Sequence, residues 1–263
     1  MLTGKLHPDI LCLQETLRYT GSSRNVIPGY EVIESFANKE EKDGRGLVLA
    51  VRCKLDLTLS SVEVHPNFLA GSVCGKKASG GWFKLLVVNV YIPPKCSLYG
   101  NRAETLEALG SFLVSENKKN GLDDILVIGD WNMTPEEAAR FLAVNNLYCT
   151  NKWLFEAPRA TRAAALGANR CIDYCLFLKR EWAEVVKVHR KWDISDHLPV
   201  TVDVRVDTLT RAVRKKKLFL RKFVERSLAE KLISCPTWNS FGHTPNHKIM
   251  WQKLLKKRKK LGL

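Results

Sequence analysis

Two almost wholly apolar runs, residues 86–92 and 125–128, constrain the fold of this 263-residue chain more than any other feature. Runs of this kind are typical of central β-strands that are covered on both faces, because polar residues do not alternate with the apolar ones. Further runs rich in apolar and β-branched residues are bounded by Gly, Pro, Asn or Asp and are also expected to form strands. They are residues 10–13, 46–52, 83–92, 171–178, 185–188 and 199–204.

Two segments between these runs have helical patterns. Residues 101–117 place apolar side chains at three- and four-residue steps, the stripe of a surface helix. Residues 135–145 follow Thr134 as a candidate N-cap, with Pro135 at the first helical position and acids in the first turn. Strands interspersed with helices indicate a layered α/β (α+β) domain.

The formal charge of +15 lies almost entirely in the last part of the chain. Residues 205–263 hold 17 basic and 3 acidic residues, whereas residues 1–204 hold 25 basic and 24 acidic residues. We therefore predict two parts, a domain over 1–206 and a basic helical tail or linker over 207–263. No stretch approaches 18 uninterrupted apolar residues, so no membrane contact is expected.

Acids and amides follow or precede several predicted strands. Glu15 follows the run 10–13, Asp130 and Asn132 follow 125–128, and Asp196 with His197 precedes 199–204. Side chains at strand ends are held rigidly and can converge on one point. Hydrolysis of a phosphodiester needs carboxylates for a hard cation, a base for water and a donor for the developing charge. This set contains each of these groups.

Five ordered motifs resemble those of the endonuclease/exonuclease/phosphatase superfamily, and the resemblance covers roughly residues 1–204. They are Gln14-Glu15-Thr16, Asn89-Val90-Tyr91-Ile92-Pro93, Gly129-Asp130-Trp131-Asn132, Ile172-Asp173-Tyr174 and Ser195-Asp196-His197. The residues of these motifs, and the segment from Pro8 to Thr16 that contains the first of them, look like those of the apurinic-like endonuclease of non-LTR retroelements. The resemblance implies a four-layer sandwich of two mixed β-sheets flanked by helices. It also implies a metal-dependent nuclease that nicks DNA.

The superfamily's roles pass to matching positions in this sequence. Glu15 would be the principal Mg²⁺ ligand, with Mn²⁺ as an alternative cation, and Asp196 would contribute to the metal or its water shell. Asp130 would activate the attacking water, with Asn132 beside it. Tyr91 would donate to the phosphate; the alternative is an aromatic side chain that packs in the core.

The last two positions concern a histidine and its partner. His197 would stabilise the charge on phosphorus or assist proton transfer, and Asp173 would hold its imidazole. The alternative for Asp173 is a salt bridge with Arg170.

The sequence departs from the superfamily pattern before Glu15. Family members normally open with a strand that carries an Asn about twenty residues upstream, and only fourteen residues precede Glu15 here. We therefore expect an N-terminally truncated domain, in which activity is less secure than the fold. Two alternative functions stay open. One is a catalytically decayed remnant that binds nucleic acid, and the other is a phosphatase or phosphodiesterase of the same superfamily that acts on a lipid or inositol phosphate.

The basic tail is expected to contact DNA, or RNA, through phosphates; the alternative is a solvated linker toward a downstream domain. The cations that motivate this are Lys215, Lys216, Lys217, Lys256, Lys257, Arg258, Lys259 and Lys260. The first residues lack the basic start and apolar run of a secretory signal, and the terminal cluster suits nuclear import. We therefore expect an intracellular, nuclear protein.

Salt dependence tests the tail. If it neutralises about six phosphates, the logarithm of the binding constant should fall with the logarithm of salt concentration at a slope of roughly −5. Deleting residues 211–263 should flatten that slope in a fluorescence-anisotropy titration with duplex DNA. A slope that stays the same after the deletion would exclude the tail from phosphate binding.

Overall fold

The computed structural model describes residues 8–19, 27–38, 44–53, 57–77, 80–98, 100–148, 161, 170–179, 183–189 and 195–204. The chain divides into two units, Met1–Ala212 and Val213–Leu263, and every described residue belongs to the first. The predicted basic tail therefore lies outside the described residues. The same holds for each of its predicted contacts, Lys215, Lys216, Lys217, Lys256, Lys257, Arg258, Lys259 and Lys260.

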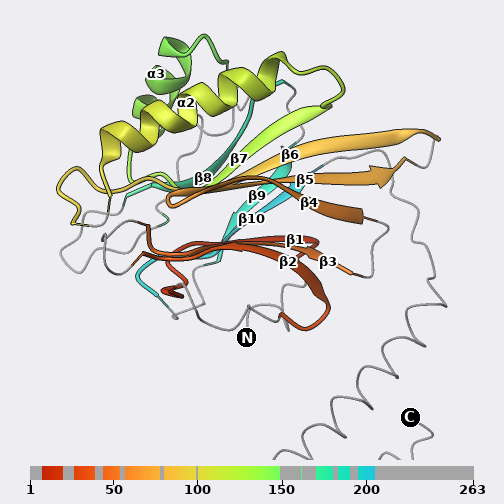
Figure 1. The fold of residues 1–263 in the computed structure, drawn as a ribbon, viewed down its shortest axis with the longest axis horizontal. Coiled ribbons are helices and arrows are strands. Elements are labelled where there is room, and N and C mark those ends of the chain that lie inside the picture. The colour runs from red at the N-terminus through yellow and green to blue at the C-terminus, as the bar shows by residue number, and fades with distance from the viewer. Residues whose placement is uncertain are drawn as a thin grey trace, which may run out of the picture. The chain divides into compact units, whose positions relative to one another are not determined.

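A five-stranded sheet in the order β4-β5-β6-β7-β8 lies at the centre of the described unit (Figure 1). Its strands are β4 (Leu57–His65), β5 (Phe68–Lys76), β6 (Trp82–Tyr91), β7 (Asp124–Asp130) and β8 (Asp173–Phe177). The two almost wholly apolar runs form the parallel pair β6 and β7 in its interior, as their composition predicts. The other pairs are antiparallel, so the sheet is mixed.

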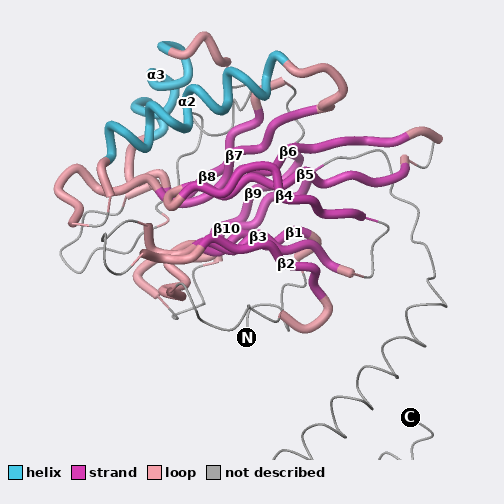
Figure 2. Tube along the Cα trace, viewed as in Figure 1, coloured by secondary structure: helices cyan, strands magenta, loops and turns pink. Residues whose placement is uncertain are grey.

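A second sheet packs against one face of the first (Figure 2). It has the order β1-β3-β2, from β1 (Ile10–Leu13), β3 (Leu47–Arg52) and β2 (Tyr30–Ser35). The apolar cluster between the two sheets includes Leu49 and Val51 of β3 and Val87 of β6. An antiparallel pair, β9 (Ala183–Val188) and β10 (Val200–Val204), completes the arrangement, and Val202 packs against the same cluster.

Among the residues that the structure describes, two helices cover the other face of the five-stranded sheet (Figure 1). They are α2 (Arg102–Lys118), capped by Asn101, and α3 (Pro135–Val144). The predicted N-cap of α3 is confirmed, because Thr134 and Glu137 form a reciprocal capping box. The predicted sandwich of two β-sheets with flanking helices is thus confirmed. No helix in the described ranges is long and apolar enough to cross a membrane.

The sequence patterns do not predict three of the described strands, β2, β4 and β5. In β4, polar and apolar residues give a weak alternation, and its last residues are largely exposed. In β5, Gly71 and Gly75 interrupt the apolar run. A Cβ at Gly71 would lie 2.7 Å from Leu49 Cδ2, so that glycine lets the two sheets approach closely. Close packing, rather than strand propensity, therefore selects these residues.

Asn89 joins the two sheets from the middle of β6. Its side chain is fully buried and donates to the carbonyl oxygens of Leu13 and Val48, each at 2.9 Å. Its own carbonyl oxygen accepts from Gln14 Nε2 at 2.6 Å. A buried amide with these partners is stable, whereas removing it leaves several buried groups without a partner. Asn89 thereby fixes β1, and the segment that follows it, against β6.

Gly129 allows β7 to run beside β6 and to end on Asp130. Its φ is +145°, and a Cβ there would lie 2.1 Å from the carbonyl oxygen of Val90. We expect Gly129→Ala to lower the free energy of unfolding by at least about 3 kcal/mol, because strain and backbone overlap add. Urea unfolding followed by circular dichroism measures the loss.

Gly80→Ala is the matched control. Gly80 also has a positive φ, +86°, but no atom lies within 4 Å of the added Cβ. Its loss should stay at about 1–2 kcal/mol, the cost of a left-handed alanine alone. Equal losses at the two positions would contradict the proposed overlap with β6.

Candidate active site

Neighbouring strands bring three predicted residues into one row. Tyr91 pairs with Asp130 across β6 and β7, and Asp130 pairs with Asp173 across β7 and β8. Side chains alternate along a strand, and Leu126 and Cys175 face the second sheet. Asp130 and Asp173 lie an even number of residues from these two, so they face the same side. The row therefore lies between the sheets, at the end where β6 and β7 finish.

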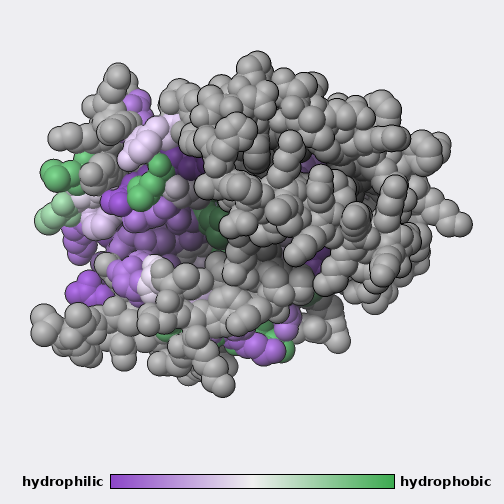
Figure 3. Space-filling view, turned by 90° about the horizontal axis from the view of Figure 1, so that it is seen from below, coloured by the Kyte–Doolittle hydropathy of each residue, from purple (hydrophilic) through white to green (hydrophobic). Residues whose placement is uncertain are grey.

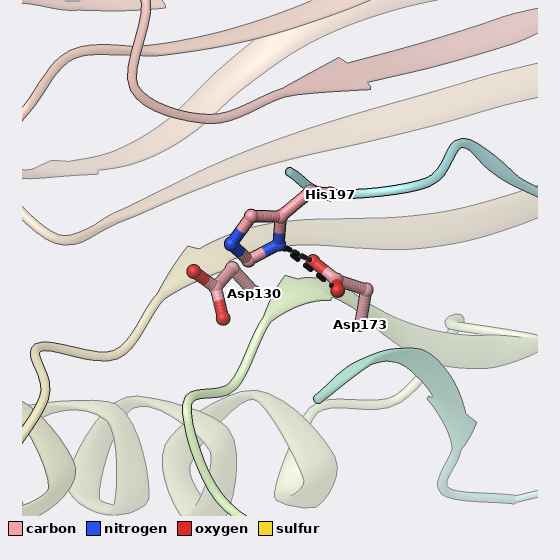
Figure 4. A group of neighbouring side chains, drawn as sticks. All are labelled: Asp130, Asp173 and His197. Carbon is pink, nitrogen blue, oxygen red and sulfur yellow. Dashed lines mark hydrogen bonds and ion pairs between the residues drawn. The ribbon is translucent and has the colours of Figure 1, made fainter. Parts of the chain in front are cut away.

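Asp173 and His197 form a hydrogen-bonded pair (Figure 4). His197 Nδ1 lies 2.9 Å from Asp173 Oδ1 and 3.0 Å from Oδ2. The hydrogen bond to Asp173 is the main reason that the pKa of His197 is raised, and burial opposes it. In the described part of the chain, Asp173 thus pairs with His197 rather than with Arg170. The pairing leaves the other ring nitrogen of His197 on the side where the Asp130 carboxylate lies.

Thr161 fixes the position of the Asp173 carboxylate by hydrogen bonds. The sequence patterns did not reveal this residue. Its buried hydroxyl donates to Asp173 Oδ2 at 2.7 Å and accepts from the backbone N–H groups of Ile172 and Asp173. Its carbonyl oxygen accepts from the N–H of Leu198, next to His197. One residue therefore ties both halves of the Asp–His pair together.

Asp130 is a carboxyl group in an unusually dry position, with only 4% of its surface exposed. Burial, followed by the negative charge of Asp173, raises its pKa to about 7, and His197 acts in the opposite direction. Asn132 fixes the group, since its backbone N–H and its Nδ2 each donate to Asp130 at 2.9 Å. A carboxyl group with a pKa near neutrality can exchange a proton with water at physiological pH.

Glu15 lies on the other side of this row, in a left-handed backbone conformation with φ +51°. The Tyr91 ring packs in the core, as the alternative for this residue requires, and its hydroxyl lies close to the Glu15 carboxylate. Burial, then the charge and closeness of that carboxylate, raises the pKa of Tyr91. Arg45, which the sequence analysis missed, forms an ion pair with Glu15, with Nη2 to Oε2 at 3.2 Å. The spacing of 30 residues gives no local sequence signal for that pair.

Asp130, Asp173 and His197 offer ligand atoms within 4.8 Å of one another, close enough to hold a metal ion. However, both oxygens of Asp173 already contact His197, and Mg²⁺ prefers oxygen ligands. The exposed carboxylate of Glu15 fits a hydrated hard cation better.

Asp196 is exposed and accepts from Ser195 Oγ at 3.3 Å. That Asp196 and Glu15 share one cation stays a prediction, as do the catalytic roles of all the predicted residues. The described surface visible in Figure 3 is mostly hydrophilic at the end of the molecule where β6 and β7 finish, with isolated hydrophobic residues.

Asp130 should titrate at an abnormal pH in metal-free protein. With EDTA present, we expect the ¹³C signal of its carboxyl carbon to titrate near pH 7, and Asp130→Asn to remove that signal. The folded pKa lies above the ordinary value of 3.8, so folding favours the protonated form. The stability that this group contributes should therefore decline, relative to Asp130→Asn, as pH rises from about 4 through about 7. A signal that titrates near pH 4 would contradict the dry environment.

Comparison with known proteins supports the site's family. The sequence model described as "Endonuclease/Exonuclease/phosphatase family" matches residues 2–197. A search of curated proteins finds no significant match. Among solved structures, the catalytic domain of Xenopus laevis APE2 is 17% identical with a TM-score of 0.57, and covers 81% of this chain and 87% of that chain.

Two further solved structures have the same fold. The 3′ phosphatase NExo from Neisseria, bound to a product DNA hairpin, is 18% identical with a TM-score of 0.54 over 78% of this chain and 92% of that one. The AP endonuclease LMAP from Leishmania major is 12% identical with a TM-score of 0.57 over 78% and 80%. At these identities the likeness concerns the fold. The family match, which spans most of the chain and every residue of the row, shows that this protein belongs to the endonuclease/exonuclease/phosphatase family.

Proposed function

We propose that the chain is a divalent-metal-dependent phosphodiesterase that nicks DNA. The observation that carries this proposal is the row Tyr91, Asp130 and Asp173, with His197 bonded to Asp173 and Glu15 close to Tyr91. These groups combine an exposed carboxylate, a proton acceptor with a pKa near 7 and a histidine whose pKa is raised. That combination suits attack of water on a phosphodiester.

Each side chain has a separate part in the reaction. Asp130, held by Asn132, would accept a proton from the water that attacks phosphorus. As the new bond from water to phosphorus forms, the bond to the leaving sugar oxygen breaks, and that oxygen takes up a proton from solvent water, to which Asp130 afterwards returns the proton that it accepted. His197, whose pKa Asp173 raises, would donate to a phosphate oxygen through its second ring nitrogen when that nitrogen carries a proton.

A cation would be held by Glu15, with Asp196 as the second candidate ligand. When bound, it would neutralise phosphate charge in the transition state. Tyr91 would place its hydroxyl near both the Glu15 and the Asp130 carboxylates, which each raise its pKa. Mg²⁺ suits an exposed carboxylate of this kind, and Mn²⁺ accepts similar ligands.

DNA as the substrate rests on indirect support. NExo was solved with a DNA hairpin, and LMAP is described as an AP endonuclease. The motifs that resemble retroelement endonucleases point the same way, as does the net charge of the last 59 residues. Nonspecific phosphate contacts of the tail would raise affinity without selecting a sequence.

Plasmid nicking tests the proposal. Purified protein with Mg²⁺ or Mn²⁺ should convert supercoiled DNA to open circles, and EDTA should stop the reaction. Asp130→Asn should lower kcat/KM by about 100-fold or more, because the proton acceptor is lost. Glu15→Ala should raise the cation concentration needed for half-maximal rate.

Glu107→Ala is the matched control, since it removes an exposed carboxylate from α2. Its nicking rate should equal that of the wild type. Equal nicking by wild type, Glu15→Ala and Asp130→Asn would remove the assignment of these residues. Faster hydrolysis of a soluble inositol phosphate than of an oligonucleotide would replace DNA with the other substrate class.

A further inference from the structure

Two flanking glycines fix the backbone conformation at Arg45. Gly44 and Gly46 flank it with φ of +65° and +81°. A Cβ at either glycine would lie 2.5 Å from a neighbouring atom, the carbonyl oxygen of Pro66 in one case and Thr16 Oγ1 in the other. Only glycine fits both positions, so the backbone on each side of Arg45 is restricted to this conformation.

The same segment is tied to the segment that carries Glu15. The N–H of Leu17 donates to the carbonyl oxygen of Arg45 at 2.9 Å, and the N–H of Thr16 donates to that of Gly46 at 3.1 Å. Two backbone hydrogen bonds therefore fix the Arg45 Cα relative to Glu15. The ion pair between the side chains follows from this placement and is not a chance encounter of two surface groups.

The environment of Arg45 is that of the candidate active site. Only 26% of its side chain is exposed, against 42% for Glu15. The positive charge of Arg45 acts on Tyr91 and opposes the effects of burial and of Glu15 on the Tyr91 pKa. The guanidinium thus lies beside the carboxylate that would hold a cation and near the row that contains Asp130.

We infer that Arg45 holds the Glu15 carboxylate in the absence of a divalent cation, and that it binds a non-bridging phosphate oxygen of the substrate when a cation is bound. This inference rests on the proposed function for its substrate. A cation at Glu15 weakens the attraction between Glu15 and Arg45, because two positive charges then compete for one carboxylate. The planar guanidinium can donate two hydrogen bonds to phosphate in a fixed geometry, which the ammonium group of lysine does not reproduce and the thioether of methionine cannot make.

Binding of Mn²⁺ tests the first half without any reaction. We expect Arg45→Met to bind Mn²⁺ about tenfold more tightly than the wild type in an electron paramagnetic resonance titration, because an internal competitor is gone. The gain should vanish when Glu15→Gln is present in the same chain, since both changes act on one contact. An unchanged Mn²⁺ affinity in Arg45→Met would overturn the inference.

Arg52→Met is the matched control. Arg52 forms an ion pair of similar length with Asp9, at 3.3 Å, and its side chain is 23% exposed, but it lies at the opposite end of β3. Its Mn²⁺ affinity should equal that of the wild type. Arg45→Lys keeps the charge and should keep the wild-type Mn²⁺ affinity to within about twofold. Should Arg45→Met not fold, Arg45→Gln, which removes the charge but keeps a polar side chain, takes its place with the same expected gain and the same overturning result.

Steady-state kinetics on an oligonucleotide test the second half. Arg45→Lys and Arg45→Met should each raise KM by about tenfold with little change in kcat, because a phosphate contact present throughout the reaction is lost. A wild-type KM in Arg45→Lys would overturn the phosphate contact. If the wild type binds Mn²⁺ with the expected variant pattern but cuts no DNA, the proposed function fails and the competition at Glu15 stands.

Discussion

The buried amide of Asn89 is the contact on which the rest of the described unit depends. It is the hydrogen-bonded link between the core of β6 and the start of the second sheet, through Leu13, Val48 and Gln14. Apolar packing between sheets is non-directional and tolerates sliding, whereas three hydrogen bonds from one side chain do not. The amide thus converts two packed sheets into a fixed pair of surfaces.

The position of the site follows from that fixation. Gln14 bonds to Asn89, and the next residue is Glu15. Tyr91 comes two residues after Asn89, and Glu15 lies close enough to its hydroxyl to raise its pKa. The hydrogen bond between Gln14 and Asn89 therefore brings the neighbouring residues Glu15 and Tyr91 close together. A carboxylate from one sheet and a tyrosine from the other can meet reproducibly only because the sheets are held in this way.

The site uses the same functional group in different environments. Asp130 is buried beside Asp173 and has a pKa near 7, whereas Glu15 is exposed and paired with Arg45. Burial raises the pKa of one carboxyl group, whereas the other stays exposed to water; under the proposed function the first would accept a proton and the second would bind a hydrated cation. Composition alone would count them as equal acids. The two carboxyl groups differ because Asp130 is buried and Glu15 is exposed. The position of β7 between β6 and β8 is what buries Asp130.

The sequence predicts the parts of this structure that are written in local patterns. The apolar runs of β6 and β7, the cap at Thr134 and the ordered motifs around Asp130, Asp173 and His197 are all readable. Arg45 and Thr161 are not, because each acts through a residue 30 or 12 positions away and has no pattern of its own. The sequence does not predict β5, because Gly71 within it is required by close packing against the second sheet and lowers the strand propensity of β5 itself. Local rules therefore find the strands and motifs, and long-range packing decides what supports them.

The alignment of Tyr91, Asp130 and Asp173 across three strands makes the proposed chemistry depend on strand pairing. Were β7 displaced along its neighbours by a single residue, every side chain on it would change sides, and glycine or tryptophan would replace the central carboxylate. Such a molecule could retain much of its sheet yet have no proton acceptor. Specific activity per mole of folded protein would then report how faithfully the central strands find their partners.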